Sequence, residues 1–183
     1  YVTNYHEPFP QQKSYKVEKV ILNPQYVKKT IFADIAILKL EEKIDFTSPS
    51  MNGTADCVPR WNRDDTFDSK RCITMGWGRD ENNQRPSILQ EVMLPMLTKK
   101  ICREYAYHSF WKVRFCAGYE WGTKYASRGD SGGPFICPVE INDGDDYKFV
   151  LVGVVSFGNS GCPSIFTRVS YFEDWIQQTM NSS

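Results

Sequence analysis

The sequence has 183 residues, with 22 basic and 22 acidic side chains and a formal charge of zero. A balanced charge creates no field that would concentrate a polyanion, so the composition argues against binding to nucleic acid or to an anionic membrane surface. The longest apolar run, residues 149–157, is too short to cross a bilayer, and no linker or repeat divides the chain. These features favour one compact domain, residues 1–183, without a membrane span.

Short β-like runs separated by turn residues follow one another along the chain, which predicts an all-β domain. We expect strands at 14–22, 35–40, 72–76, 149–156 and 165–169. The polar, acidic segment 142–146 lacks the regular ligand spacing of a calcium loop and therefore predicts a hairpin turn.

Two helices are predicted. The weaker one begins near Thr98, with Ile101 and Tyr105 facing inward. The stronger one begins at Ser170, which forms a capping box with Glu173 because each side chain can bind an otherwise unpaired amide at the helix start. Its apolar residues recur at helical spacing and place one face against the domain: Phe172, Trp175, Ile176 and Thr179.

Six cysteines in a chain of this length indicate disulfides and a secreted or extracytoplasmic protein. Zinc is the alternative, but the chain has no C-x-x-C pair and its two histidines are far apart, so we expect no metal and no cofactor. The sequon at Asn52 agrees with secretion and predicts glycosylation there. The cysteine spacing alone leaves many pairings open.

The strongest local signal is the run Gly129-Asp130-Ser131-Gly132-Gly133-Pro134. A serine among glycines can occupy a tight turn in which the amides of Gly129 and Ser131 point at one spot, as in an oxyanion hole beside a nucleophile. An ordinary glycine-rich turn is the alternative, because Gly and Ser populate many loops.

This run resembles the nucleophile motif of the trypsin/chymotrypsin family of serine peptidases, and the segment 33–40 resembles the strand that carries the family's catalytic aspartate. Segments 72–78, 115–118 and 154–158 match three further family segments, in the family's order. The resemblance implies a chymotrypsin-like double six-stranded antiparallel β-barrel with a C-terminal helix. Its parts would be the end of an incomplete first barrel in 1–60, the second barrel in 61–169, and the helix with its tail in 170–183.

The resemblance also implies a zymogen-derived serine endopeptidase and a role for individual residues. Ser131 would be the nucleophile, Asp34 would orient the catalytic histidine, and the amides of Gly129 and Ser131 would bind the oxyanion. Asp130 would pair with the ammonium group of a new N-terminus.

The family's catalytic histidine should lie further before Asp34 than residue 1, and neither His6 nor His108 matches its place. We therefore expect an upstream chain or segment of the same precursor to supply it. Cys57 matches the family cysteine that tethers the domain to such a segment, with a Cys57–Cys162 pair as the alternative. The resemblance further implies the pairs Cys72–Cys137 and Cys102–Cys116, and it leaves Cys162 unassigned because Ser127 stands where its partner is usual.

The specificity pocket departs from the family pattern. Tyr125 stands at the pocket base, where trypsin-like members carry Asp, so an Arg or Lys at the P1 position of a substrate would lose its counter-ion. Only two residues separate Cys162 from Ile165, which removes part of one wall. We expect restricted, non-tryptic specificity for a protein or peptide substrate. The pocket residues implied are Tyr125, Ala126, Arg128, Ser156, Phe157, Gly158 and Ser164.

A secreted pseudoprotease acting as a binding or scaffolding module is the alternative from another functional class. The intact Asp34 and Ser131 favour the enzyme, whereas the shortened pocket and the unpaired Cys162 favour the binding module. The segment 128–131 also spells an integrin-binding tetrapeptide, but an inward Asp130 could not reach a receptor metal.

Overall fold

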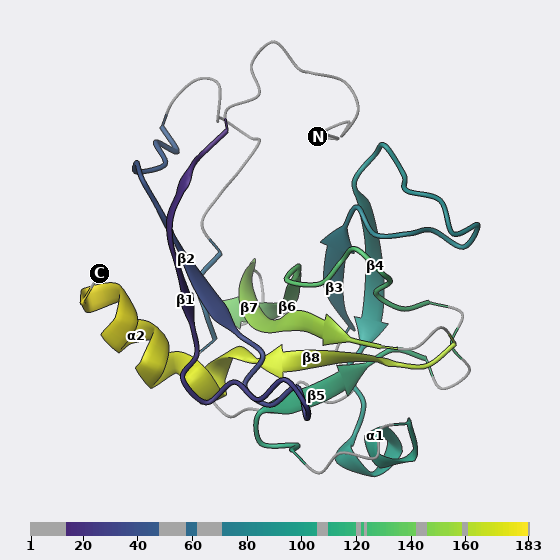
Figure 1. Ribbon diagram of the computed structural model, residues 1–183. Coiled ribbons are helices and arrows are strands. Elements are labelled where there is room, and N and C mark those ends of the chain that lie inside the picture. Colours follow the sequence, from purple (N-terminus) through teal and green to yellow (C-terminus); the bar gives the residue numbers. More distant parts are fainter. Residues whose placement is uncertain are drawn as a thin grey trace.

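The computed structural model describes residues 14–47, 58–61, 71–105, 110–119, 122, 124–141, 146–158 and 161–182. Within these residues it contains a six-stranded antiparallel sheet, a two-stranded sheet and a C-terminal helix (Figure 1). The prediction of an all-β domain with a C-terminal helix is confirmed.

The six-stranded sheet has the strand order β4-β3-β6-β7-β8-β5. Its strands are β3 (Arg71–Gly76), β4 (Gln90–Pro95), β5 (Arg114–Ala117), β6 (Pro134–Ile141), β7 (Asp146–Phe157) and β8 (Ser164–Arg168). The two edge strands meet, because the amide of Leu97 donates to the carbonyl of Cys116 at 3.0 Å and the amide of Gly118 donates to that of Pro95 at 2.9 Å. The sheet therefore curls closed and surrounds its own core.

Three aromatic rings, from β6, β8 and β5, fill this core. The centroids of Phe135 and Phe166 lie 4.4 Å apart, and those of Phe115 and Phe166 lie 5.4 Å apart. The disulfide Cys72–Cys137 crosses the same core between β3 and β6, and both sulfurs belong to fully buried residues. This pairing is the one that the family resemblance implies.

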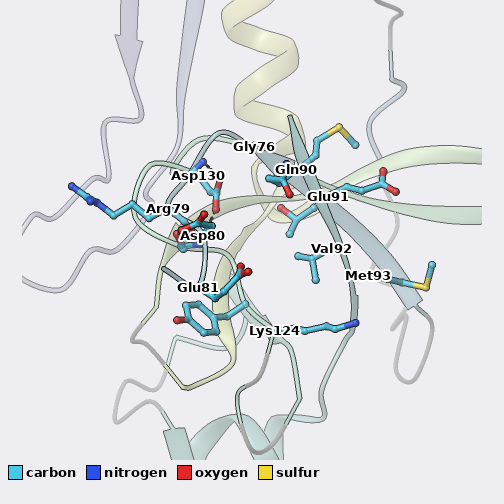
Figure 2. Close-up of a pocket in the computed structure, with 15 residues that line it drawn as sticks. Gly76, Arg79, Asp80, Glu81, Gln90, Glu91, Val92, Met93, Lys124 and Asp130 are labelled. Carbon is cyan, nitrogen blue, oxygen red and sulfur yellow. Dashed lines mark hydrogen bonds between the residues drawn. The ribbon is translucent and has the colours of Figure 1, made fainter. Parts of the chain in front are cut away.

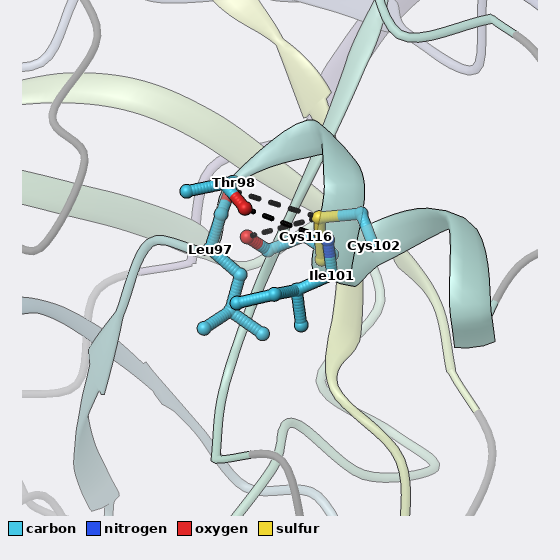
Figure 3. The surroundings of a disulfide bond; sticks show 5 residues. All are labelled: Leu97, Thr98, Ile101, Cys102 and Cys116. Atoms are coloured by element: carbon cyan, nitrogen blue, oxygen red, sulfur yellow. Dashed lines mark hydrogen bonds between the residues drawn. A yellow bond between two sulfur atoms is a disulfide. The ribbon is translucent and has the colours of Figure 1, made fainter.

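The second disulfide attaches the short helix α1 (Lys99–Tyr105) to the barrel. Cys102 is the buried residue of this helix and pairs with Cys116 in β5 (Figure 3). The pairing again agrees with the resemblance. The expected inward positions Ile101 and Tyr105 are only half-buried, because the disulfide turns Cys102 toward the barrel.

The two-stranded sheet consists of β1 (Val17–Leu22) and β2 (Ala36–Leu40). Its inner face carries the pair Ile21–Ile37, and Ile37 packs against the cluster of Val113, Val169 and Phe172. On the outer face, Val20 and Leu38 pair directly, and each is 57% exposed. Two large apolar side chains exposed side by side on a two-stranded sheet form a surface against which further protein can pack.

The chain ends in a 3₁₀ turn, η2 (Val169–Phe172), followed by helix α2 (Glu173–Asn181), which lies beside β1 and β2 in Figure 1. The predicted capping box is wrong. Ser170 lies inside the 3₁₀ turn, and its carbonyl accepts the hydrogen bond from the amide of Glu173. Among the described residues, no helix is long and apolar enough to cross a membrane.

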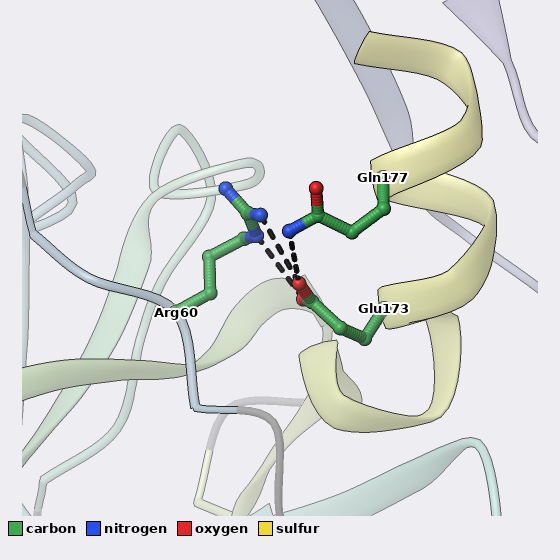
Figure 4. Close-up of polar contacts among 3 residues, drawn as sticks. All are labelled: Arg60, Glu173 and Gln177. Carbon is green, nitrogen blue, oxygen red and sulfur yellow. Dashed lines mark hydrogen bonds and ion pairs between the residues drawn. The ribbon is translucent and has the colours of Figure 1, made fainter. Parts of the chain in front are cut away.

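The Glu173 carboxylate does not cap the helix but binds Arg60. The Arg60 Nε and Nη2 atoms each lie 3.1 Å from a different carboxylate oxygen, and Gln177 donates to one of them at 2.9 Å (Figure 4). The flanking amide of Trp61 and carbonyl of Pro59 bind Leu151 in β7. This ion pair therefore ties α2 to a segment attached to the barrel.

The hydrogen bond from Arg60 holds the pKa of Glu173 below its ordinary value, so this carboxylate stabilises the fold above about pH 4.5 and less as the pH falls through its folded-state pKa. We expect Glu173→Gln to lower the free energy of unfolding by about 1 kcal/mol at pH 7 and by much less near pH 3. Urea denaturation at both pH values measures this, with Glu140→Gln as the exposed-carboxylate control. An equal loss at both pH values would contradict the expectation.

Candidate active site

Asp34 lies at the end of the turn that leads into β2, and two hydroxyl groups of the barrel hold it. Ser156 Oγ in β7 donates to Asp34 Oδ2 at 2.6 Å, and Thr167 Oγ1 in β8 donates to the Asp34 carbonyl at 2.8 Å. The side chain of Asp34 is half-buried. The sequence predicts Ser156 only as a residue of the specificity pocket, and nothing in its pattern indicates the bond of Ser156 to Asp34 or the role of Thr167.

Arg114 is a third barrel residue that binds this turn. Its Nη2 atom donates to the carbonyls of Thr30 and Ile31, and the residue is only 4% exposed. Burial lowers the pKa of Arg114, and the negative charge of Asp34 partly opposes that shift. The only sequence signal for Arg114 is a basic residue between Val113 and Phe115, and that pattern indicates no role.

The turn that carries Ser131 is attached to the same strand as Ser156. The amide of Gly132 donates to the carbonyl of Val155, and the amide of Val155 donates to the carbonyl of Gly133, both at 2.9 Å. Because Ser156 follows Val155 and binds Asp34, β7 brings the two predicted catalytic residues to one end of the barrel.

Within the described part of the chain, the amides of Gly129 and Ser131 donate to no protein group, whereas the amide of Asp130 between them donates to the carbonyl of Ser127 at 3.0 Å. Gly129 has φ +113°, a conformation that side chains with a Cβ rarely adopt, and a Cβ there would lie 3.1 Å from the Cα of Gly78. The turn therefore leaves two amide donors unused on either side of one bonded amide.

The carboxylate of Asp130 points away from Ser131 into the protein. Oδ1 accepts from the amide of Gly78 and Oδ2 accepts from the amide of Ser127, both at 2.7 Å. Two charge-assisted bonds of this kind hold the turn firmly and keep Asp130 inward. Ser127 also donates its hydroxyl proton to the carbonyl of Arg79.

A cavity of about 560 Å³ opens beside Ser131. Six of the seven predicted pocket residues line it, namely Tyr125, Ala126, Arg128, Ser156, Phe157 and Gly158. Ser164 does not line this cavity, because its hydroxyl accepts from the amide of Ala126 at 2.8 Å and is buried behind the wall. The loop residues Arg79, Asp80, Glu81 and Asn83 also line it, and no local motif had identified them.

A second cavity, of about 590 Å³, lies on the other side of the Ser131 turn. Its lining includes Gly129 and Ser131 together with the largely apolar residues Trp77, Pro86 and Leu89. Ser131 therefore stands between two hollows rather than at the mouth of one.

A third cavity, of about 340 Å³, lies beside the Asp130 carboxylate. Figure 2 shows Asp80, Glu81 and Asp130 on one side of it and Val92 and Met93 on the other. Its lining contains four carboxylates, the fourth being Glu91, and two cationic side chains, Arg79 and Lys124. Among the described residues, no group of three or more His, Cys, Asp or Glu side chains is arranged to hold a metal ion.

Several predicted residues lie outside the described part of the chain: His6, His108, Asn52, Cys57 and residues 142–145 of the hairpin turn predicted at 142–146. Cys162 is described and half-buried, and it forms no disulfide with another described cysteine.

Comparison with known proteins gives two kinds of match. The sequence model of the trypsin family matches residues 2–176. The chain is 35% identical over 175 residues to the proclotting enzyme of Tachypleus tridentatus and 33% identical over 177 residues to transmembrane protease serine 5 of Homo sapiens. Each alignment covers 91% of this chain but only 44% and 36% of those proteins, respectively, so the chain spans less than half the length of either.

The close contact between Gly78 and Asp130 generates a prediction. A Cβ at Gly78 would lie 2.4 Å from the Asp130 carboxylate, so Gly78→Ala must displace that carboxylate from its two amide donors. We expect a loss of about 2 kcal/mol or more in the free energy of unfolding, measured by chemical denaturation. Gly158→Ala is the control, because a Cβ there makes only ordinary contact with Ser164, and an equal loss in both variants would contradict this account.

Proposed function

Because the chain belongs to the trypsin family of serine peptidases, we propose that it forms the greater part of an endopeptidase domain that hydrolyses peptide bonds through an acyl-enzyme on Ser131. The observation that carries the proposal is the pattern of amide use in the Ser131 turn. Among the described residues, the amides of Gly129 and Ser131 have no acceptor, whereas Asp130 between them is bonded through its amide and its carboxylate. An ordinary glycine-rich turn does not require two unbonded amides on either side of a bonded one.

The proposed reaction follows from these positions. Ser131 Oγ attacks the scissile carbonyl and passes its proton to a histidine held by Asp34, and the amides of Gly129 and Ser131 bind the resulting oxyanion. The histidine then protonates the leaving amine as the C–N bond breaks. Water hydrolyses the ester in the same way and restores the serine hydroxyl. Asp34 keeps its orientation through its bond to Ser156.

The two cavities flanking Ser131 support a polypeptide substrate, because an extended chain can place residues in both while its scissile bond lies at the hydroxyl. In the cavity for the P1 side chain, Tyr125 offers no carboxylate of the kind that pairs with Arg or Lys in trypsin-like members. Asp80 and Glu81 also line this cavity, but Arg79 and Arg128 balance their charge. The P1 residue preferred is therefore small or uncharged, since burying a cation without a counter-ion of its own is unfavourable.

The third cavity supports the proposed role of Asp130 in activation. Its excess of carboxylates favours a cationic guest, and the Asp130 carboxylate lies at its wall. An α-ammonium group formed by cleavage of a zymogen matches that charge. The ion pair would then hold the Ser131 turn from inside.

An upstream segment of the same precursor is proposed to supply the histidine and the remainder of a first barrel that ends near residue 60. The exposed Val20–Leu38 pair on the two-stranded sheet supports this, because it is an apolar surface suited to further strands. Cys57 is the proposed disulfide link to that segment, and the alternative is a Cys57–Cys162 bond.

The link through Cys57 is tested by the mass of the native protein before and after reduction, for the wild type and for Cys57→Ser. We expect reduction to release a second polypeptide from the wild type and none from the variant. Alkylation of Cys57 in the unreduced protein would contradict the proposal.

A pseudoprotease is a second candidate because Cys162 forms no disulfide with any of the described cysteines. The bonds of Ser127 favour the enzyme. Ser127, at the position of the missing cysteine, binds Arg79 and Asp130 through its hydroxyl and its amide, so hydrogen bonds replace the disulfide in holding the loop. The disulfides Cys72–Cys137 and Cys102–Cys116 support a secreted or extracytoplasmic location for either function.

Labelling with a small fluorophosphonate separates the two functions, because the probe needs the nucleophile, the histidine and the amides rather than a deep pocket. We expect the protein with its upstream segment to be labelled at Ser131, and Ser131→Ala not to be labelled. Peptide-library cleavage should then show small or uncharged P1 residues. Absence of labelling in folded protein would favour the pseudoprotease, and efficient cleavage after Arg or Lys would contradict the role given to Tyr125.

A further inference from the structure

The turn that precedes Asp34 has an unfavourable backbone. Ile31 and Ala33 both have φ +52°, in the left-handed region that residues with a Cβ adopt rarely and β-branched residues least of all. Such conformations persist where surrounding contacts hold them. The contacts that hold this turn therefore determine where Asp34 lies.

Three adjacent strands of the barrel provide those contacts. Thr167 in β8 lies directly opposite Arg114 in β5, and opposed residues of an antiparallel pair point to the same face of the sheet. On that face Thr167 binds the carbonyl of Asp34, Arg114 binds the carbonyls of Thr30 and Ile31, and Ser156 in β7 binds the Asp34 side chain.

Arg114 differs from the two hydroxyl residues because it is a buried cation. Within the described part of the chain, no carboxylate forms a salt bridge with it. Its guanidinium carbon lies 5.5 Å from the centroid of the Phe110 ring and 5.3 Å from that of Phe157, so the two rings and the two carbonyls surround the charge. Carbonyl oxygens and aromatic faces both attract a cation. The arrangement leaves the guanidinium little freedom to move.

We propose that Arg114 is a positioning residue. It clamps the strained turn at Thr30 and Ile31 to the barrel, and it thereby fixes the positions of Asp34 and of the Phe157 ring, which lines the cavity beside Ser131. The effect on catalysis rests on the proposed function, whereas the clamp itself does not. One planar guanidinium reaches both the segment that carries Asp34 and the strand that carries Ser156, which is a span that a shorter or apolar side chain cannot cover.

The test uses the protein with its upstream segment and compares Arg114→Met, Arg114→Lys and Arg103→Met. The control Arg103 is an exposed arginine in the last turn of α1. Hydrogen–deuterium exchange is followed in peptides covering 28–38 and, for comparison, 90–95, and kcat and KM are measured with a small uncharged substrate.

We expect Arg114→Met to raise exchange in 28–38 by about tenfold without changing 90–95, and to lower kcat by about tenfold or more with KM altered less than about threefold. Arg114→Lys should fall between the wild type and Arg114→Met, because it keeps the charge but not the planar fork. Arg103→Met should match the wild type.

A folded Arg114→Met protein with unchanged exchange in 28–38 would overturn the clamp, as would equal increases in both peptides. If Arg114→Met does not fold, the same measurements on Arg114→Lys test the proposal. Exchange in 28–38 and a kcat that both equal those of the wild type would then overturn it. A wild-type protein that neither reacts with the fluorophosphonate nor cleaves peptides would refute the proposed function, while the exchange result would still decide whether Arg114 clamps the turn.

Discussion

The hydrogen bonds that join Leu97 to Cys116 and Pro95 to Gly118 close the six-stranded sheet, and the positions of the site residues depend on that closure. An open sheet of this size twists progressively, so the two edge strands would diverge. Closure instead holds β5, β8 and β7 as three adjacent strands of one barrel. Arg114, Thr167 and Ser156 then reach the same short turn from three strands.

The site is therefore organised around strands rather than around its loops. Val155 binds the Ser131 turn on one side of β7, and the next residue, Ser156, holds Asp34. Side chains supported by regular strands are placed more reproducibly than side chains supported only by loops. The loop at 79–83 contributes lining to the cavity beside Ser131, but it does not carry either of the two proposed catalytic residues.

Motifs with a local pattern could be predicted from the sequence, and contacts between distant segments could not. The turn around Ser131, the strand after Asp34 and the C-terminal helix all have short-range signals, and the structure contains them. The predicted start of that helix, a capping box at Ser170, is wrong because Glu173 binds Arg60, a partner 113 positions away, and not a local amide. Arg114 was missed for the same reason, since its carbonyl partners lie 83 and 84 positions away.

The hydrogen bonds near Ser127 have a consequence for how redox conditions affect the cavity beside Ser131. In the family, a disulfide from this position would join the loop of Ser127 to the loop of Cys162. Here the amide of Ala126, next to Ser127, donates to the hydroxyl of Ser164 at 2.8 Å, and Ser127 itself binds Arg79 and Asp130. None of these bonds involves sulfur, so a reductant does not break them and this side of the cavity is held in the same way under oxidising and reducing conditions.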